Sequence, residues 1–123
     1  GDFTRRMALI TEALNSSSID IAKTFETDVG DDAWATYLRG DRGIFTRRAV
    51  RLLDKHEARS VHDVYSGDAE FRQVVNRYIA DFEGMLRTVL STRDGNALAV
   101  TLLSSDIGKL YVVLAQAIER LRE

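Results

Sequence analysis

The sequence predicts an all-α fold, a helical bundle of five or six helices, on three observations. Its 123 residues contain no proline, which a helix tolerates only in its first turn. Apolar residues recur at alternating spacings of three and four, the period of an amphipathic helix. No segment shows the apolar–polar alternation of a half-buried strand. We expect the two C-terminal helices to form a long antiparallel hairpin within this bundle.

Length and composition indicate one globular domain over residues 1–123. Hydrophobic residues make up 45% of the chain and charged residues 29%, which suffices for a single core. The chain has no cysteine, which excludes disulfides and zinc–thiolate sites, and it has neither a secretory signal nor an apolar run of roughly 20 residues. We therefore expect a cytoplasmic protein. Because the chain begins with glycine rather than methionine, we also expect it to be a domain excised from a longer protein.

The first helix is expected to begin at Asp2, whose side chain can cap it. Its apolar stripe consists of Phe3, Met7, Ile10 and Leu14. A second stripe follows the polar serines at positions 16–18 and consists of Ile21, Phe25 and Val29. These serines leave two alternatives open, one kinked helix or two separate helices.

Three short helices are expected between residues 31 and 65. Asp31 and Asp32 cap the first of them, which runs to about Arg39, and Gly40 to Gly43 then form a turn. The second covers residues 44–55 and the third about 58–65. The second helix turns four side chains inward: Phe45, Ala49, Leu52 and Leu53.

The penultimate helix is expected from about Asp68 to Thr92, with Asp68 as its N-cap. Six residues at spacings of four and three form its core-facing seam: Phe71, Val75, Tyr78, Phe82, Met85 and Val89. A turn cluster follows, in which Gly95 is expected to close the helix in the left-handed conformation.

The last helix is expected to be continuous from about residue 97 to 122. Its seam keeps the same rhythm: Val100, Leu103, Ile107, Leu110, Leu114, Ala117 and Leu121. The residues Ser104, Ser105 and Asp106 can also cap a new helix, so a break at Ser105 is the alternative. Gly108 allows a close contact between helices.

The sequence carries no motif for catalysis, a metal or a cofactor. His56 and His62 are six residues apart and lack the Glu-x-x-His pattern of di-iron bundles. Ser66 next to Gly67 lacks the strand–turn–helix context of a nucleophile elbow, and the glycines match no phosphate-binding loop. We therefore predict a non-enzymatic protein without a cofactor, and a hydrolase is the remotest alternative.

An arginine-rich and aromatic stretch is the most informative feature of the chain. Residues 34–55 carry six basic and two acidic side chains, a local charge of +4 in a chain of net charge −2. Guanidinium groups suit phosphate and carboxylate ligands, so the candidate anion- or partner-binding residues are Arg39, Arg42, Arg47, Arg48 and Arg51. The alternative is that these arginines are solvated or pair with the acidic remainder of the chain. In that interpretation the core takes Trp34, Tyr37, Leu38, Phe45 and Leu52.

A helix-turn-helix that binds DNA is the second function considered, with residues 32–55 as its two helices. Neutralisation of phosphates dominates affinity for DNA, and a net charge of −2 opposes it. DNA binding is therefore the runner-up function.

The favoured function is protein interaction or assembly. Tyr111, Val112 and Val113 stand beside the seam of the last helix and leave more apolar surface than one neighbouring helix can cover. These three are the candidate self-association residues. The expected partner is a protein, with a homodimer favoured.

Two segments resemble parts of a known group of proteins. They are residues 40–53 (Gly-Asp-Arg-Gly-Ile-Phe-Thr-Arg-Arg-Ala-Val-Arg-Leu-Leu) and 101–121 (Thr-Leu-Leu-Ser-Ser-Asp-Ile-Gly-Lys-Leu-Tyr-Val-Val-Leu-Ala-Gln-Ala-Ile-Glu-Arg-Leu). Both are similar to segments near the C-terminus of very long coiled-coil, apolipoprotein-like proteins of alphaproteobacteria, sometimes labelled kinesin-like. The resemblance covers about a third of the chain and includes no catalytic motif. It implies a terminal helical domain of a larger scaffold protein and supplies no site residues.

Overall fold

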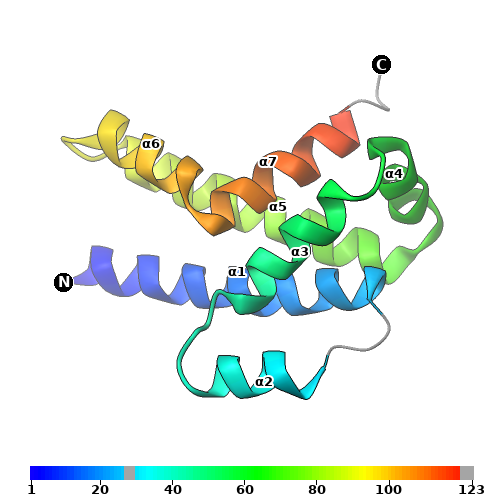
Figure 1. Cartoon of the computed structure of the whole chain (residues 1–123). Coiled ribbons are helices and arrows are strands. Elements are labelled where there is room, and N and C mark those ends of the chain that lie inside the picture. Colours follow the sequence, from blue (N-terminus) through cyan, green and yellow to red (C-terminus); the bar gives the residue numbers. More distant parts are fainter. Residues whose placement is uncertain (27–29, 120–123) are drawn as a thin grey trace.

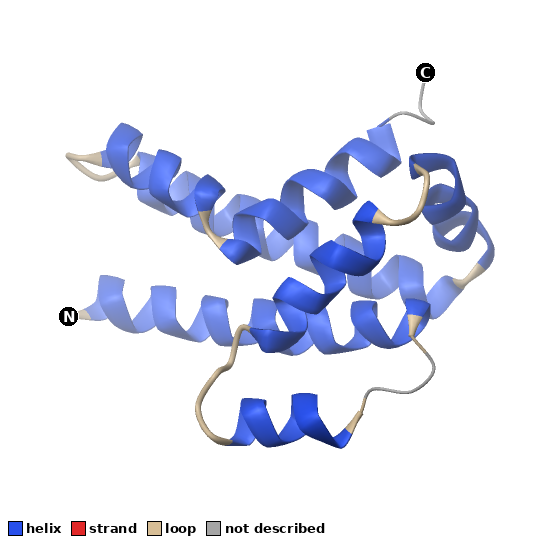
Figure 2. Ribbon diagram, in the orientation of Figure 1, coloured by secondary structure: helices blue, strands red, loops and turns tan. Residues whose placement is uncertain are grey.

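The computed structural model describes residues 1–26 and 30–119. Within them the chain forms helices and turns and no strand, which confirms the all-α class (Figure 2). Seven helices follow one another, as labelled in Figure 1: α1 (Asp2–Phe25), α2 (Asp31–Leu38), α3 (Ile44–Asp54), α4 (Ala58–Gly67), α5 (Ala69–Leu90), α6 (Gly95–Ser104) and α7 (Asp106–Glu119). The count exceeds the expected five or six because the last expected helix is two helices.

Helix α1 runs without a break through the three serines, so the segment forms one helix rather than two. Ser18 is fully buried, and its Oγ donates to the carbonyl oxygen of Leu14 at 2.8 Å. Thr46 Oγ1 of α3 lies 2.9 Å from Ser18 Oγ and 2.8 Å from Asn15 Oδ1. These contacts satisfy the buried hydroxyl groups, so the polar segment needs no water-exposed turn. Val29 lies outside the described residues.

The cap expected at Asp2 is wrong. Gly1 is the N-cap of α1, no side chain caps the helix, and Asp2 is its first residue. Asp31 and Asp32 likewise stand in the first turn of α2 behind the N-cap Gly30, with no side-chain cap bond. All three carboxylates still lie where the positive end of a helix dipole favours them. Their placement matches an acidic first turn rather than a cap.

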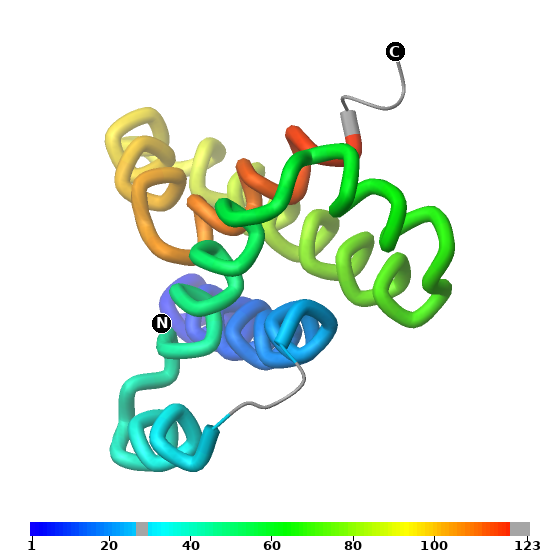
Figure 3. Tube along the Cα trace, turned by 45° about the vertical axis from the view of Figure 1, so that its right-hand side comes forward, coloured from blue at the N-terminus to red at the C-terminus, as the bar shows by residue number. Residues whose placement is uncertain are grey.

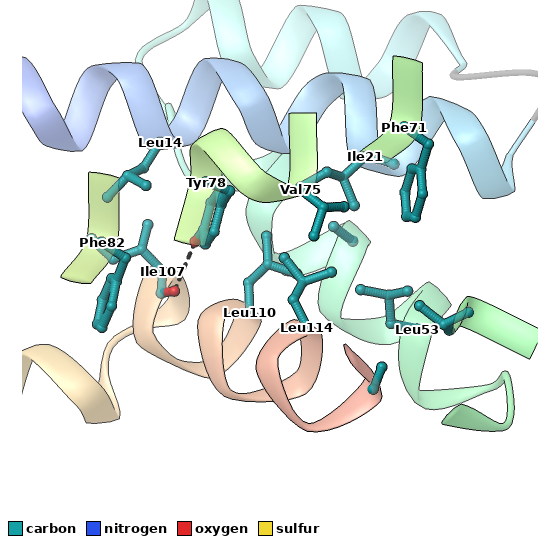
Figure 4. Packing of buried hydrophobic residues seen from close by; sticks show 14 of the residues in the cluster. Leu14, Ile21, Leu53, Phe71, Val75, Tyr78, Phe82, Ile107, Leu110 and Leu114 are labelled. Carbon is teal, nitrogen blue, oxygen red and sulfur yellow. Dashed lines mark hydrogen bonds between the residues drawn. The ribbon is translucent and has the colours of Figure 1, made fainter. Parts of the chain in front are cut away.

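Helix α5 supplies the central seam of the core. Asp68 is its N-cap and accepts a hydrogen bond from the Phe71 backbone amide at 3.1 Å, as expected. All six seam residues are buried, so the expected register of this helix is confirmed. Figure 4 shows part of the seam facing Leu14 and Ile21 of α1 on one side and Leu110 and Leu114 of α7 on the other.

The last expected helix is interrupted at Ser105. The prediction of one continuous helix from residue 97 to 122 is therefore wrong. The axes of α6 and α7 differ in direction by 77°. Ser105 Oγ accepts a hydrogen bond from the Gly108 amide at 3.3 Å and so begins α7. A Cβ on Gly108 would lie 2.3 Å from the carbonyl oxygen of Leu102, so this corner forms only around a glycine. Leu121 lies outside the described residues.

Gly95 does not close α5 in the left-handed conformation as expected. It is instead the first residue of α6. Among the described residues the positive φ is that of Gly40, +118°, in the turn expected between α2 and α3. A Cβ on Gly95 would lie 2.7 Å from the carbonyl oxygen of Leu90. The position therefore requires a glycine because the backbones of α5 and α6 approach closely. The long hairpin of two long helices is replaced by α5 followed by a shorter α6 and a separate α7.

Helices α1, α3, α4, α5 and α7 contribute to one hydrophobic core. Helix α1 packs against α5 and α3, and α7 packs against α3, α4 and α5. Helix α2 lies at the outer edge beyond α1 and α3 (Figure 3), and α6 packs mainly against α5 and α7. No helix of the described residues has the length and hydropathy to cross a membrane alone, and only the bent pair of α6 and α7 meets that test together.

Candidate interaction surfaces

Helix α2 is attached to α3 by aromatic side chains. The Phe45 ring is fully buried, and its centroid lies 4.7 Å from that of Trp34 and 5.6 Å from that of Tyr37. These three aromatic residues thus pack together, but only Phe45 is buried as the structural alternative expected, since Trp34 and Tyr37 are half-buried. Leu38 does not join them, because it is 74% exposed. Leu52 of α3 is half-buried and packs against the core.

Arg47 of α3 is held between two carboxylates from different corners of the fold. It donates to Asp41 in the turn before α3 and, at 3.5 Å, to Asp106 in the first turn of α7. The hydrogen bond with Asp41 raises the pKa of the Arg47 guanidinium above its ordinary value. Arg47 therefore links the turn between α2 and α3 to the corner between α6 and α7.

The other four arginines lie in separate surroundings. Arg48 Nε lies 3.1 Å from Glu26 Oε2, and the Arg42 guanidinium carbon lies 4.5 Å from the centroid of the Tyr37 ring. Arg39 is exposed and donates to Thr36 Oγ1 at 3.5 Å. Arg51 is exposed, and no ion pair among the described residues includes it. These arginines thus have different partners within the chain, and anion binding by them stays a prediction.

The α2–turn–α3 segment has the helix lengths expected of a helix-turn-helix. Helix α3 packs against α1 and α7 as well as α2, and Arg51 on it is exposed. A recognition helix needs one face open to the major groove. DNA binding by this segment stays a prediction.

The two histidines lie in different surroundings. His56 follows the end of α3 and its ring lies 5.0 Å from that of Phe25 in α1, whereas His62 is within α4. His56 Nδ1 lies 2.8 Å from the carbonyl oxygen of Leu52, and His62 Nδ1 lies 3.2 Å from Ser66 Oγ. Both contacts are exposed. Among the described residues no three side chains of His, Asp or Glu converge as a metal site would require.

Tyr111 points from α7 toward α5. Its ring stacks on Phe82 with centroids 4.4 Å apart, and its hydroxyl donates to Glu83 Oε2 at 2.8 Å. Val112 is 36% exposed, whereas Val113 is half-buried and contacts the core. The three candidate self-association residues are therefore divided: Tyr111 has partners within the chain, and the two valines border an open groove.

This apolar groove lies between α3, α6 and α7 and has a volume of about 610 Å³. Its lining consists of Val50, Asp54, Leu103, Ser104, Lys109, Val112 and Val113. Most of these side chains are apolar, with one carboxylate and one ammonium group among them. Sequence reasoning found the two valines but missed the contributions of α3 and α6, because it placed Leu103 in a buried seam.

Helix α6 extends this apolar lining. Val100 is 65% exposed and Leu103 36% exposed, although both were expected in the core-facing seam. They stand three positions apart and so lie on one side of the helix. The bend at Ser105 explains the difference, since it rotates α6 away from the register of α7. The signal in the sequence was the density of leucine, valine and alanine over residues 97–103, more than a peripheral helix can bury.

No protein-family model, no curated protein sequence and no solved structure matches this chain. The resemblance to alphaproteobacterial coiled-coil proteins stays a prediction.

Proposed function

We propose that this chain is a non-enzymatic assembly domain that associates with a second copy of itself through the apolar groove. The observation that carries the proposal is the exposure of Leu103 and Val112, which line that groove, together with that of Val100, three positions before Leu103 on α6. Contiguous apolar surface with a polar border is typical of protein contact sites. Burying it removes apolar area from water, which favours association by about 25 cal/mol per Å² before the costs of binding.

The chemistry of the groove supports contact rather than catalysis. Its hydroxyl group, on Ser104, donates to the carbonyl oxygen of Val100 at 2.7 Å. The lining includes no histidine that could act as a base toward it. A reacting centre needs a nucleophile and a base within hydrogen-bond distance of each other. The groove instead offers branched apolar side chains of the kind that fill protein interfaces.

We also infer the cellular compartment of this assembly domain and the kind of protein that contains it. The absence of cysteine suits a reducing compartment, and we place the domain in the cytoplasm. A larger scaffold protein, as the resemblance of residues 40–53 and 101–121 implies, would use such a domain to join two chains.

The proposal is tested by sedimentation of the chain over a range of concentrations. The apparent mass at high micromolar concentration is expected to be twice the chain mass of 13.8 kDa. Leu103→Asp and Val112→Asp are each expected to shift the chain to monomer, because a carboxylate would be buried at the contact. Leu38→Asp is the matched control, since Leu38 is exposed on α2, away from the groove, and this variant should associate like the parent.

Two results would contradict the proposal. One is a parent chain that stays monomeric at all concentrations. The other is dimerisation that Leu103→Asp and Val112→Asp leave unchanged. Circular dichroism of each variant shows whether it keeps the parent fold.

A further inference from the structure

We infer that the apolar groove receives the same groove of a second copy about a two-fold axis, with Asp54 of each copy facing Lys109 of the other. This inference rests on the proposed self-association and specifies its geometry. The groove is lined by one acidic and one basic side chain, Asp54 from the end of α3 and Lys109 from α7. The remaining lining residues are neutral.

Both charged side chains are available for an intermolecular contact. Asp54 and Lys109 are exposed, and neither belongs to an ion pair among the described residues. Arg47 and Arg48 on the same helix α3 already have carboxylate partners in the chain. The charges at the groove thus remain for a contact outside the molecule.

The arrangement of α3 and α7 places the two charges at different levels of the groove. The helices run beside each other in the same direction, as Figure 1 shows, and Arg47 meets Asp106 where both begin. Asp54 is at the last turn of α3, whereas Lys109 is in the first turns of α7. Counted from the contact between Arg47 and Asp106, Lys109 is level with Val50, so Asp54 lies about one helical turn further along the groove on the other helix.

A two-fold axis makes this arrangement self-complementary. In an isologous contact, residue i of one copy meets residue j of the other, and j meets i. An axis that crosses the groove midway between Asp54 and Lys109 brings each carboxylate opposite the ammonium group of the other copy. The apolar lining residues Val50, Leu103 and Val112 then face their counterparts near the axis. A groove with two charges of one sign would repel its own copy.

The charge pattern also favours a second copy over other occupants. An anionic membrane surface or a nucleic acid would require an excess of basic side chains at the groove. An acidic or a basic peptide would require charges of one sign. One carboxylate and one ammonium group separated by apolar side chains match a partner with the same pattern.

The test exploits the exchange of charge between copies. Asp54→Lys places two ammonium groups opposite each other at both ends of the contact, and Lys109→Asp does the same with two carboxylates. Each variant alone is expected to dimerise at least about tenfold more weakly than the parent, since like charges at an interface are unfavourable. A 1:1 mixture of the two is expected to form a heterodimer, because every contact is again between opposite charges. The double variant Asp54→Lys/Lys109→Asp is expected to regain the homodimer.

Matched controls lie on α4, outside the groove. Asp63→Lys and Arg59→Asp change the net charge by the same amounts at exposed positions. Each is expected to dimerise like the parent, and their mixture should show no preference for the heterodimer. Native mass spectrometry with one variant carrying a mass tag distinguishes homodimer from heterodimer, and thermal unfolding confirms that each variant is folded.

The outcomes separate this inference from the proposed function. If the single charge variants dimerise like the parent while Leu103→Asp does not, the groove is the contact but the two-fold charge pairing is wrong. A mixture that stays monomeric also overturns the pairing. A parent chain that is monomeric overturns the proposed function and this inference together. Loss of vesicle binding on Leu103→Asp, in a parent chain that binds phosphatidylserine vesicles as a monomer, would assign the groove to a membrane instead.

Discussion

The α2–α3 region holds the five arginines that the sequence indicates as candidate anion- or partner-binding residues. The α6–α7 region instead holds exposed apolar side chains that the sequence pattern places in the core. In the first region two of the arginines, Arg47 and Arg48, pair with carboxylates of the same chain. In the second, Val100 and Leu103 face water. The comparison teaches that a charged stretch and an apolar stretch of one chain can both depart from the surroundings expected of them, the first partly paired within the fold and the second partly exposed.

This difference depends on how far each kind of side chain can extend to meet a partner. An arginine side chain is long and flexible, so a carboxylate several residues away can meet it within the fold. A valine or leucine on an outer helix can be covered only if another backbone approaches closely. Helix α6, turned 77° from α7, has α5 and α7 as its main neighbours and so leaves one side uncovered.

The largest expected effect is at the core that both regions share. Phe82 is fully buried and stacks on Tyr111, so Phe82→Ala is expected to lower the free energy of unfolding by about 3–5 kcal/mol. Leu90→Ala on the same helix is the control, with an expected loss near 0.5 kcal/mol because Leu90 is 48% exposed. Urea unfolding measures both. A midpoint unchanged by Phe82→Ala would show that the α5 seam is not buried.

Substitution of two glycines tests what the corner between α6 and α7 requires. Gly108→Ala is expected to lower the free energy of unfolding by about 1–3 kcal/mol, since its Cβ would lie 2.3 Å from the Leu102 carbonyl oxygen. Gly84→Ala, in the middle of α5, is expected to raise it by up to about 1 kcal/mol, because its Cβ has room and alanine favours a helix. Thermal unfolding compares the two. Equal effects would mean that the bend does not depend on Gly108.

Tyr78 joins α5 to the start of α7 and makes the stability of the fold fall at alkaline pH. Its buried hydroxyl donates to the Ile107 carbonyl oxygen at 2.7 Å, visible in Figure 4, and burial raises its pKa well above the ordinary value of 10.0. The unfolded chain releases this proton near pH 10 while the folded chain keeps it. Stability is therefore complete below pH 10 and falls above it by about 1.4 kcal/mol per pH unit.

Tyr78→Phe isolates that contribution. The variant is expected to lose about 1–2 kcal/mol near neutral pH, because the hydrogen bond is absent, and to lose less than the parent between pH 10 and 11. Denaturant unfolding at a series of pH values measures the slope, with Tyr37→Phe as the control. An alkaline slope identical in parent and variant would contradict the assignment to Tyr78.

The smallest expected effect distinguishes arginines that are engaged within the fold from one that is not. Arg47→Gln is expected to lower the free energy of unfolding by about 0.5–1 kcal/mol at low salt, and by less at 1 M salt, since its ion pairs are partly exposed. Arg51→Gln removes the same charge and is expected to change stability by less than about 0.5 kcal/mol. If both variants lost the same free energy of unfolding, Arg47 would be no more engaged within the fold than Arg51.

Much of the fold could be predicted where one helix is long and its pattern unbroken. The α5 seam, its Asp68 cap and the inward side of α3 at Phe45, Ala49 and Leu53 are as expected. The failures are at positions decided by neighbours. Leu38 is apolar but has no helix over it, and Gly95 is required by the approach of Leu90 rather than by a left-handed φ.

The candidate site could be predicted only in part. Val112 and Val113 were identified from the surplus width of the last helix, but the groove they border also needs Val50 of α3 and Leu103 of α6. Val50 and Leu103 are more than 50 positions apart in the chain, and no single helical pattern includes both. One sequence therefore does not show that they line the same groove.

The sequence by itself determined the helical class, because periodicity and the absence of proline act locally along the chain. It also determined which side of α5 is buried. Only the tertiary structure decided whether each polar segment continues or breaks a helix: Ser18 of α1 is buried and hydrogen-bonded to Thr46 of α3, whereas Ser105 begins a new helix. Serine suits a helix interior or a cap almost equally, so the choice depends on which partner the rest of the fold provides.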